Sequence, residues 1–350
     1  MIRVLIAEDS MTCLGLLTAI IETDPALKLI GHAANGAAAV SMTRELRPDV
    51  VLMDIHMPIM DGFEATRQIM VDAPTPIVIV SATVNVREVA VSMHALRVGA
   101  LAVLPKPGLT GKDDFVERAR EFTASVRAMS AVRVVQRWEA RSLPPSTPPS
   151  RSSAQPTIVA VAASTGGPGA IYRVLSELPA DFPLPILVVQ HIAKGFVDGL
   201  AAWLDGASPL TVKVAEHAEA LQPGRVYVAP DDQHLGVSGR RTVALSKQAA
   251  VAGFRPSGTF LFDSVAEHHR SGAVAVILTG MGEDGLPGLR KVREAHGRVL
   301  AQDAETSVVF GMPGAAVAAG LADMTLPIDM IAARLQHLVA DIKPRERERL

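Results

Sequence analysis

Three residues with catalytic chemistry each follow a short apolar run in the C-terminal half of the chain. Ser164 comes after Val-Ala-Val-Ala-Ala, His191 ends Val-Val-Gln-His, and Asp284 lies in Leu-Thr-Gly-Met-Gly-Glu-Asp-Gly. If the apolar runs are parallel strands, their carboxyl ends meet at one edge of a sheet. A serine hydroxyl becomes a nucleophile when an imidazole accepts its proton and a carboxylate fixes the tautomer of that imidazole. The arrangement therefore predicts acyl transfer or hydrolysis at this edge.

The turn after Ser164 is rich in glycine, with Gly166-Gly167-Pro168 leading into a stretch of helical spacing. Glycines let the backbone turn tightly and expose N–H groups, and a helix N-terminus favours developing negative charge. A nucleotide-binding turn is the competing interpretation. The segment has neither G-x-G-x-x-G nor a Lys-Ser/Thr ending, and it also lacks the G-x-S-x-G of ordinary α/β-hydrolases.

Other roles remain open for the two partners of Ser164. His191 could be a hydrogen-bonded core residue, and Asp284 could simply cap the helix that follows it. Glu283 is a neighbouring rival acid. We favour Asp284 because Gly285 gives its backbone room to turn.

The N-terminal half carries a second cluster of chemical groups at predicted strand ends. Glu8 and Asp9 follow the first strand, Asp54 follows the third, Ser81 closes the fourth and Lys106 follows the fifth. Carboxylates that converge repel one another unless a cation joins them, and hard oxygen ligands suit Mg²⁺. A carboxylate beside Mg²⁺ can attack a phosphoryl group while the metal and Lys106 balance charge, and we expect Asp54 to be that nucleophile. The alternative is that Asp54 starts a turn and Lys106 is a solvated loop cation.

These clusters require two α/β domains, each a doubly wound parallel sheet flanked by helices. Strand-like runs in the first half are Arg3–Ala7, Leu27–Ala33, Val50–Met53, Ile77–Ser81 and Ala102–Leu104, with a last helix at Lys112–Ala128. Those in the second half are Ile158–Ala162, Ile186–Gln190, Val226–Ala229, Ala273–Leu278 and Val299–Ala301, with helical spacing at Ala170–Glu177 and Gly285–Ala295. A Pro/Ser-rich stretch from Arg141 to Pro156 predicts an extended linker. We expect domains at 1–125 and 157–345, joined by a helix end and linker at 126–156.

Amino-acid composition limits the partners and the cellular location that we expect for this protein. The 350 residues are 49% hydrophobic and 4% aromatic, with a formal charge of −2, so nothing points to a nucleic acid partner. Cys13 is the single cysteine, which excludes an intrachain disulfide. The N-terminus does not read as a signal peptide, and no apolar run is long enough to span a bilayer. We expect a monomeric, cytoplasmic protein without membrane insertion.

The first half resembles response-regulator receiver domains over roughly Met1–Ser125, through the segments A-E-D, D-I-H-M-P-I-M-D-G, V-S-A-T and L-P-K-P. The resemblance implies a flavodoxin-like fold and a chemotaxis histidine kinase as phosphodonor. It also implies roles for individual residues: Glu8 and Asp9 at Mg²⁺, Asp54 as phospho-acceptor, Ser81 as switch hydroxyl and Lys106 as phosphoryl partner. Many receivers have an aromatic switch residue where this chain has Val103, so we expect the signal to pass through domain contacts.

The second half resembles the chemotaxis protein-glutamate methylesterase family through S-T-G-G-P, V-V-Q-H, R-P-S and L-T-G-M-G-E-D-G. The resemblance implies a Rossmann-like domain that hydrolyses glutamate methyl esters on chemoreceptors and deamidates receptor glutamines, with no cofactor for the esterase step. It makes Ser164 the nucleophile, His191 the general base and Asp284 the orienting acid. Further site residues are the candidate oxyanion donors, the N–H groups of Thr165 and Met281. Arg255 could steer an acidic receptor segment, or it could be an ordinary surface arginine.

Departures from the family pattern concern receptor preference more than the reaction, for example Thr259 in place of an acid and Ala193 in place of a proline. By analogy with the family we expect the unphosphorylated receiver to cover the esterase cleft and phosphorylation to uncover it. Two other functions compete: a receiver-regulated binding protein with an inactive esterase-like domain, and a nucleotide-dependent enzyme.

Overall fold

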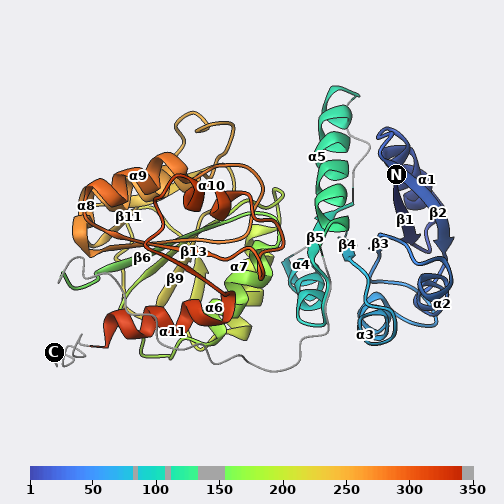
Figure 1. The fold of residues 1–350 in the computed structure, drawn as a ribbon, viewed down its shortest axis with the longest axis horizontal. Coiled ribbons are helices and arrows are strands. Elements are labelled where there is room, and N and C mark those ends of the chain that lie inside the picture. The colour runs from blue at the N-terminus through green and yellow to red at the C-terminus, as the bar shows by residue number, and fades with distance from the viewer. Residues whose placement is uncertain (82–85, 107–111, 133–153, 341–350) are drawn as a thin grey trace. The chain divides into compact units, whose positions relative to one another are not determined.

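The chain divides into two compact units, Met1–Glu139 and Ala140–Leu350. The computed structural model describes residues 1–81, 86–106, 112–132 and 154–340, and Figure 1 shows the helices and strands of each unit. Most of the predicted linker, residues 133–153, lies outside the described residues, as do residues 341–345 of the predicted second domain. Within the ranges described, no helix combines the length and the apolar character needed to cross a membrane.

The first unit is a parallel five-stranded sheet in the order β2-β1-β3-β4-β5. Its strands are β1 Ile2–Ala7, β2 Leu27–Ala33, β3 Val50–Met53, β4 Ile77–Ser81 and β5 Ala102–Pro105. Its helices are α1 Met11–Glu22, α2 Gly36–Leu46, α3 Gly62–Asp72, α4 Val86–Met93, the short 3₁₀ helix η1 His94–Leu96 and α5 Lys112–Ser130. This order is the flavodoxin-like doubly wound topology, which confirms the predicted fold.

Buried apolar strands explain why this sheet is parallel and covered on both faces. Every residue of β3 and β4 is buried, and such continuous runs of Val, Ile and Leu are typical of strands with helices on both sides. Each large aliphatic side chain buried in this way stabilises the fold by about 1.5–3 kcal/mol. Side-chain caps begin the helices that follow the first strands: Ser10 accepts from the amide of Cys13, and Asn35 accepts from that of Ala38.

The second unit has a seven-stranded parallel sheet in the order β14-β13-β12-β6-β7-β9-β8, and a separate antiparallel hairpin of β10 and β11. The strands are β6 Ile158–Ala163, β7 Ile186–Gln190, β8 Thr211–Val214, β9 Arg225–Val228, β10 His234–Ser238, β11 Thr242–Ser246, β12 Ala273–Ile277, β13 Arg298–Gln302 and β14 Met324–Leu326. The helices are α6 Gly167–Ser176, α7 Val197–Ala207, α8 Gly258–His269, the 3₁₀ helix η2 Arg270–Gly272, α9 Leu286–Glu294, α10 Met312–Ala318 and α11 Ile328–Val339. The five predicted strands of this half are present.

Four strands among the described residues were not predicted from the sequence. The edge strands β8 and β14 are short and only partly buried, so they carry no continuous apolar run. Strands β10 and β11 belong to the hairpin rather than to the parallel sheet. Short edge strands and hairpins resemble loops when only apolar runs are counted.

Strand β6 lies at the centre of the second sheet, between β12 and β7. The chain leaves β6 toward β7 on one side and returns later to β12 on the other, so this is the topological switch point where ligands of open α/β sheets bind. The segments that carry Ser164, His191 and Asp284 follow these three neighbouring strands.

Candidate active site

Ser164 is the first residue after β6, and its backbone is held from several directions. Its N–H donates to the carbonyl of Thr279 at 3.0 Å, and its carbonyl accepts from the N–H of Gly167 at 2.8 Å. Gly280 lies so close that a Cβ there would be 2.8 Å from the Ser164 Cβ. The nucleophile candidate therefore sits in a rigid turn at the start of α6, as the glycine-rich segment predicted.

His191 is the first residue after β7, and its N–H donates to the carbonyl of Ala163 at 3.0 Å. Its side chain, 11% exposed, approaches Asp284 with Nε2 2.9 Å from Oδ2. Since a carboxylate can only accept, Nε2 carries the proton and Nδ1 is the unprotonated nitrogen. That Nδ1 is buried and has no hydrogen-bond partner among the described residues.

Asp284 has a fully buried side chain that accepts five hydrogen bonds. The donors are His191 Nε2, the N–H of Gly258, Ser257 Oγ, the N–H of Thr259 and the N–H of Gly285. Burial acts to raise the pKa of this carboxyl, but the hydrogen bonds from His191 and Ser257 outweigh it and lower the pKa to about 2. Asp284 is therefore an anion at neutral pH and can stabilise an imidazolium next to it.

The alternative interpretation, in which Asp284 caps the helix that follows it, is wrong. Helix α9 has Gly285 as its N-cap residue, without a side-chain cap. Asp284 instead accepts from Gly258 and Thr259, the first two residues of α8, a helix distant in sequence. Its carboxylate thus meets the positive end of α8. Glu283, the rival acid, is exposed.

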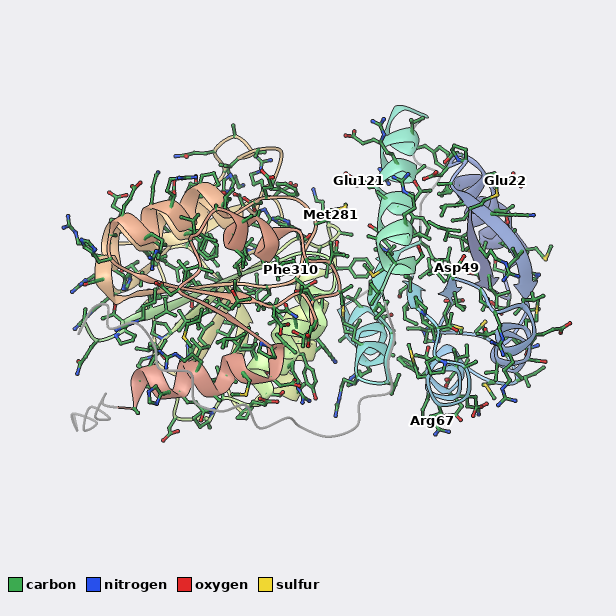
Figure 2. All side chains as sticks on the ribbon, viewed as in Figure 1. Glu22, Asp49, Arg67, Glu121, Met281 and Phe310 are labelled. Carbon is green, nitrogen blue, oxygen red and sulfur yellow. The ribbon has the colours of Figure 1, made fainter. Side chains whose placement is uncertain are left out.

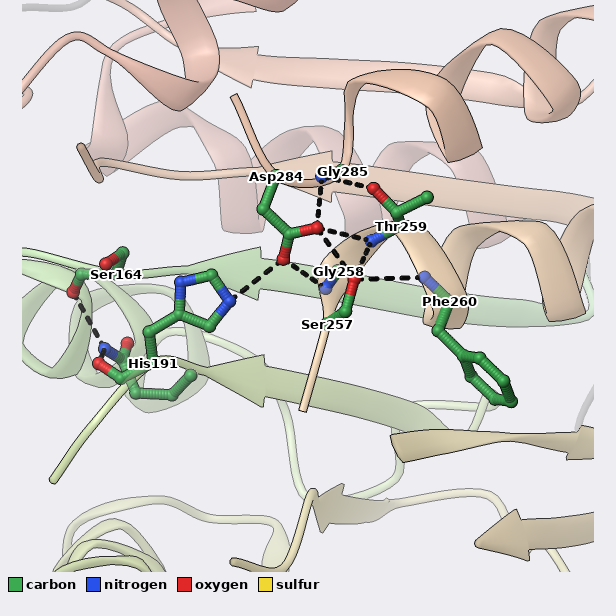
Figure 3. A network of polar contacts seen from close by, with 9 residues as sticks. Ser164, His191, Ser257, Gly258, Thr259, Phe260, Asp284 and Gly285 are labelled. Atoms are coloured by element: carbon green, nitrogen blue, oxygen red, sulfur yellow. Dashed lines mark hydrogen bonds and ion pairs between the residues drawn. The ribbon is translucent and has the colours of Figure 1, made fainter. Parts of the chain in front are cut away.

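Figure 3 shows the imidazole between Ser164 and Asp284, with Nε2 facing the carboxylate and the opposite edge of the ring toward Ser164. No hydrogen bond joins Ser164 Oγ to the imidazole in the described part of the chain. The two backbones are nevertheless tied together, because Gln190 Nε2 donates at 2.8 Å to the carbonyls of both Ser164 and His191. The structure therefore brings the three predicted residues to one site, with the serine hydroxyl not yet bonded to the ring.

The candidate oxyanion donors lie on the two turns beside Ser164. The N–H groups of Thr165 and Met281 have no acceptor within the described ranges, while the carbonyl of Thr165 accepts from Thr279 Oγ1 at 2.9 Å. Met281, labelled among the side chains in Figure 2, is 45% exposed. Two free N–H groups beside a serine are what stabilisation of a tetrahedral oxyanion needs.

Arg255 follows Phe254, whose ring stacks on His191, and its guanidinium is already engaged. Its guanidinium donates to the carbonyls of Lys247 and Gln248, and lies 3.8 Å from a carboxylate oxygen of Asp232. Those contacts anchor the loop that leads into Ser257. A third of the side chain is exposed, which leaves room for an acidic partner.

In the first unit, the predicted acidic pocket is assembled at the carboxyl ends of β1 and β3. Glu8, Asp9 and Asp54 each offer a carboxylate oxygen, and these oxygens lie within 4.8 Å of one another. Lys106 Nζ is 2.8 Å from Glu8 Oε2 and 3.0 Å from Asp54 Oδ2. Burial, with the charge of Asp54 adding to it, raises the pKa of Glu8 above its usual value of 4.5. Carboxylates this close together repel one another, and a divalent cation would relieve the repulsion. Their hard oxygen donors fit Mg²⁺.

Ser81 ends β4, and Val103 lies inside the neighbouring strand β5, three residues before Lys106. The Ser81 hydroxyl is 2.6 Å from that of Ser92 on α4, and its carbonyl accepts from the N–H of Lys106. Val103 is buried in β5, so the position that often carries an aromatic switch residue holds a small core side chain.

Several residues of the site were given no role by sequence reasoning, although the segments that carry them were noted. Ser257 is fully buried, caps α8 and donates to Asp284 Oδ1 at 2.7 Å. Phe254 stacks on the imidazole of His191 with ring centroids 4.2 Å apart. Gln190 joins the serine and histidine turns. The R-P-S and V-V-Q-H segments contain Ser257 and Gln190, but only the fold shows what these side chains contact.

Comparison with known proteins gives a family match for each of the two units. Residues 159–335 match the family model described as CheB methylesterase, and residues 4–120 match the response regulator receiver domain. A Myxococcus xanthus protein named protein-glutamate methylesterase/protein-glutamine glutaminase 4 is 53% identical over 95% of this chain and 96% of its own length. A protein of the same name from a Rhizobium meliloti group 3 operon is 44% identical over 96% of each chain.

The crystal structure of the Thermotoga maritima CheB methylesterase catalytic domain matches with a TM-score of 0.52 and 44% identity, covering 53% of this chain and 100% of that one. The chain therefore belongs to the CheB methylesterase family, with a response regulator receiver domain before its methylesterase domain.

Proposed function

We propose that this protein hydrolyses glutamate methyl esters on methyl-accepting chemoreceptors, releases methanol, deamidates receptor glutamines to glutamates, and so serves adaptation in chemotaxis. The observation that carries the proposal is the hydrogen bond of 2.9 Å from His191 Nε2 to the buried Asp284, which leaves Nδ1 as a base beside Ser164. The names of the full-length relatives, methylesterase and glutaminase, support the same reaction.

In the proposed reaction the three side chains act as a proton relay. His191 Nδ1 takes the hydroxyl proton of Ser164 as Oγ bonds to the ester carbonyl carbon. The carbonyl oxygen becomes an anion, which the N–H groups of Thr165 and Met281 stabilise. Asp284 remains ionised and balances the imidazolium, since its pKa is about 2.

The tetrahedral adduct then loses its alkoxy group. The proton on Nδ1 passes to the methoxy oxygen, the C–O bond breaks, and methanol leaves an acyl-enzyme on Ser164. Water attacks that acyl group with His191 again as base, which frees the glutamate carboxylate and restores the serine hydroxyl. With a glutamine substrate, the same proton goes to nitrogen and ammonia leaves.

Methanol release from methylated receptor membranes tests this function directly. The full-length chain is expected to release methanol, and Ser164→Ala is expected to lose at least about 1000-fold in rate. A fluorophosphonate probe should label the wild-type chain on Ser164 and leave Ser164→Ala unlabelled. A binding protein with an inactive esterase fold would release no methanol and take no label, and normal release by Ser164→Ala would refute the serine mechanism.

We propose that the receiver controls this activity through phosphorylation of Asp54. Glu8, Asp9 and Asp54 would hold Mg²⁺, which when bound neutralises charge on a phosphoryl group. Lys106 pairs with Asp54 and Glu8 and would pair with the phosphoryl oxygens. Ser81 would be the switch hydroxyl, and a chemotaxis histidine kinase would be the phosphodonor.

We expect the receiver to inhibit the esterase when it is unphosphorylated, by covering the esterase cleft. Phosphorylation would relieve that inhibition. Methanol release by the full chain should rise when a small-molecule phosphodonor and Mg²⁺ are added, and Asp54→Ala should abolish that rise. Equal rates with and without the phosphodonor in the wild-type chain would contradict this mechanism.

A further inference from the structure

We infer that Gln190 is a positioning residue of the esterase site, whose carboxamide sets the direction of the Thr165 N–H. The inference rests on the proposed serine mechanism. Gln190 is the last residue of β7 and is only 3% exposed. Its Nε2 donates at 2.8 Å to the carbonyl of Ser164 and at 2.8 Å to the carbonyl of His191. One side chain therefore joins the backbone of the nucleophile to that of the base.

The chemistry of the two contacts requires an amide at this position. Both partners are carbonyl oxygens, so the group between them must have two N–H donors, which a glutamine provides and a glutamate does not. The other end of the carboxamide, Oε1, is buried without a partner among the described residues. A Cβ at residue 167 would lie 1.9 Å from that oxygen, so Gly167 makes room for the carboxamide at the start of α6.

Because a peptide group is planar, the hydrogen bond from Gln190 to the Ser164 carbonyl also fixes the direction of the Thr165 N–H. In a trans peptide the C=O and the following N–H point in opposite directions. The Ser164 carbonyl faces Gln190 Nε2 and the N–H of Gly167, so the N–H of Thr165 points away from Gln190. That N–H has no other acceptor within the described ranges and is available to an oxyanion.

The second oxyanion donor is aimed in the same way, but by backbone alone. The carbonyl of Gly280 accepts from the N–H groups of Gly311 and Met312 at 3.1 and 2.9 Å, so the N–H of Met281 points away from them. Among the described residues, four donors bind these two carbonyls, and Gln190 is the one side chain among them. It is therefore the point at which substitution can misdirect an oxyanion donor without removing a reacting group.

Two substitutions at Gln190 test the inference in the full-length chain. Gln190→Met keeps the size and removes both donors, and Gln190→Glu keeps the shape and replaces the donors by acceptors. Each should lower kcat for methyl ester hydrolysis by about 10- to 100-fold, somewhat less than loss of an oxyanion donor itself, and leave KM within about twofold. Gln336→Met is the matched control, because its amide donates to the carbonyl of Glu177 and its loss should leave kcat unchanged.

Inhibitor affinity separates positioning from a general structural role. A peptide boronic acid that replaces the glutamyl ester forms a tetrahedral adduct with an oxygen in the oxyanion position, and its affinity should fall in proportion to kcat/KM. Affinity for the matching glutamate peptide should not change. Gly167→Ala would place a Cβ 1.9 Å from Oε1 and 2.8 Å from the Ala163 Cβ, so it displaces the carboxamide and should also lower boronate affinity.

The results with the Gln190 variants can be told apart from those with Ser164→Ala, which test the proposed function itself. Wild-type kcat in a folded Gln190→Met chain would overturn the inference, as would a lower kcat with unchanged boronate affinity. If Ser164→Ala retains methanol release, the proposed mechanism fails whatever Gln190 does. If Ser164→Ala is inactive and Gln190→Met is normal, only the role of Gln190 is lost.

Discussion

The phenyl ring of Phe254 lies parallel to the imidazole of His191, with centroids 4.2 Å apart and 6° between the planes. Together with the hydrogen bond to Asp284, this contact holds the ring both by an edge and by a face. Stacked rings of this kind are worth about 0.5–1.5 kcal/mol beyond the area they bury.

Replacing Phe254 by Leu should lower kcat by about 3- to 10-fold, because the imidazole loses the restraint on its face. The measurement is methanol release at saturating substrate. Phe260→Leu is a matched control, since Phe260 makes a comparable stack on His234 at 4.6 Å, and we expect it to change kcat by less than about twofold. Equal losses in the two variants would contradict a specific role for Phe254.

Substituting Gly280 by Ala should disturb the nucleophile itself. The added Cβ would meet the Ser164 Cβ at 2.8 Å and the sulfur of Met312, so the serine turn must shift. We expect at least about a 10-fold fall in kcat and a loss of about 1–3 kcal/mol in the free energy of unfolding. Calorimetry of the full chain and methanol release measure the two effects.

Gly169→Ala is the control for this substitution. Gly169 lies inside α6, and a Cβ there would have nothing within 4 Å. Alanine should therefore be neutral or stabilise the helix by about 0.5–1 kcal/mol. Loss of activity in Gly169→Ala would show that the turn responds to any change near α6.

Asp284 should make stability depend on pH in the acid range. Its pKa in the folded protein is about 2, below the ordinary value of 3.8, so its anion stabilises the fold. That contribution is fully present above pH 4 to 5 and is lost as pH falls toward 2. The lowered pKa corresponds to about 2 kcal/mol. Wild type should be more stable than Asp284→Asn at pH 7, and the difference in their unfolding temperatures should shrink below pH 4.

Lys106 should compete with Mg²⁺ for the receiver carboxylates. Burial acts to lower the pKa of Lys106, but its hydrogen bonds to Glu8 and Asp54 raise the pKa above 10.5, so the side chain is cationic at pH 7. Lys106→Met should bind Mg²⁺ about 3- to 10-fold more tightly, because one positive charge leaves the pocket. The same variant should no longer be activated by a phosphodonor.

Titration calorimetry of the full-length chain with MgCl₂ measures this affinity. Lys28→Met removes the same charge from an exposed position on β2 and should leave Mg²⁺ binding unchanged. Weaker binding by Lys106→Met than by wild type would show that the lysine helps to hold the metal. Binding should also weaken as pH falls through the raised pKa of Glu8, since its proton competes with the ion.

Much of the fold could be predicted because buried parallel strands have a strong local signature. Strands β3, β4, β6 and β7 are fully buried runs of apolar residues, and the polar residues that follow them mark the carboxyl edge of each sheet. The hairpin β10–β11 and the edge strands β8 and β14 lack that signature, so they were missed. Of the helices, only those matching α5, α6 and α9 were predicted with residue ranges, and their ends are displaced by a few residues: α6, for example, begins at Gly167 rather than Ala170.

The sequence by itself determined which chemical groups this protein has, which strand ends carry them and which family it belongs to, because those properties depend on residue types and short spacings. Only the tertiary structure decided that Nε2 rather than Nδ1 of His191 faces Asp284, that the carboxylate of Asp284 rests on the N-terminus of α8, and that Gln190 ties two turns together. His191 and Asp284 are 93 positions apart, and Ser257 and Asp284 are 27 apart. Contacts over such separations depend on how strands and helices pack, and local sequence does not specify that packing.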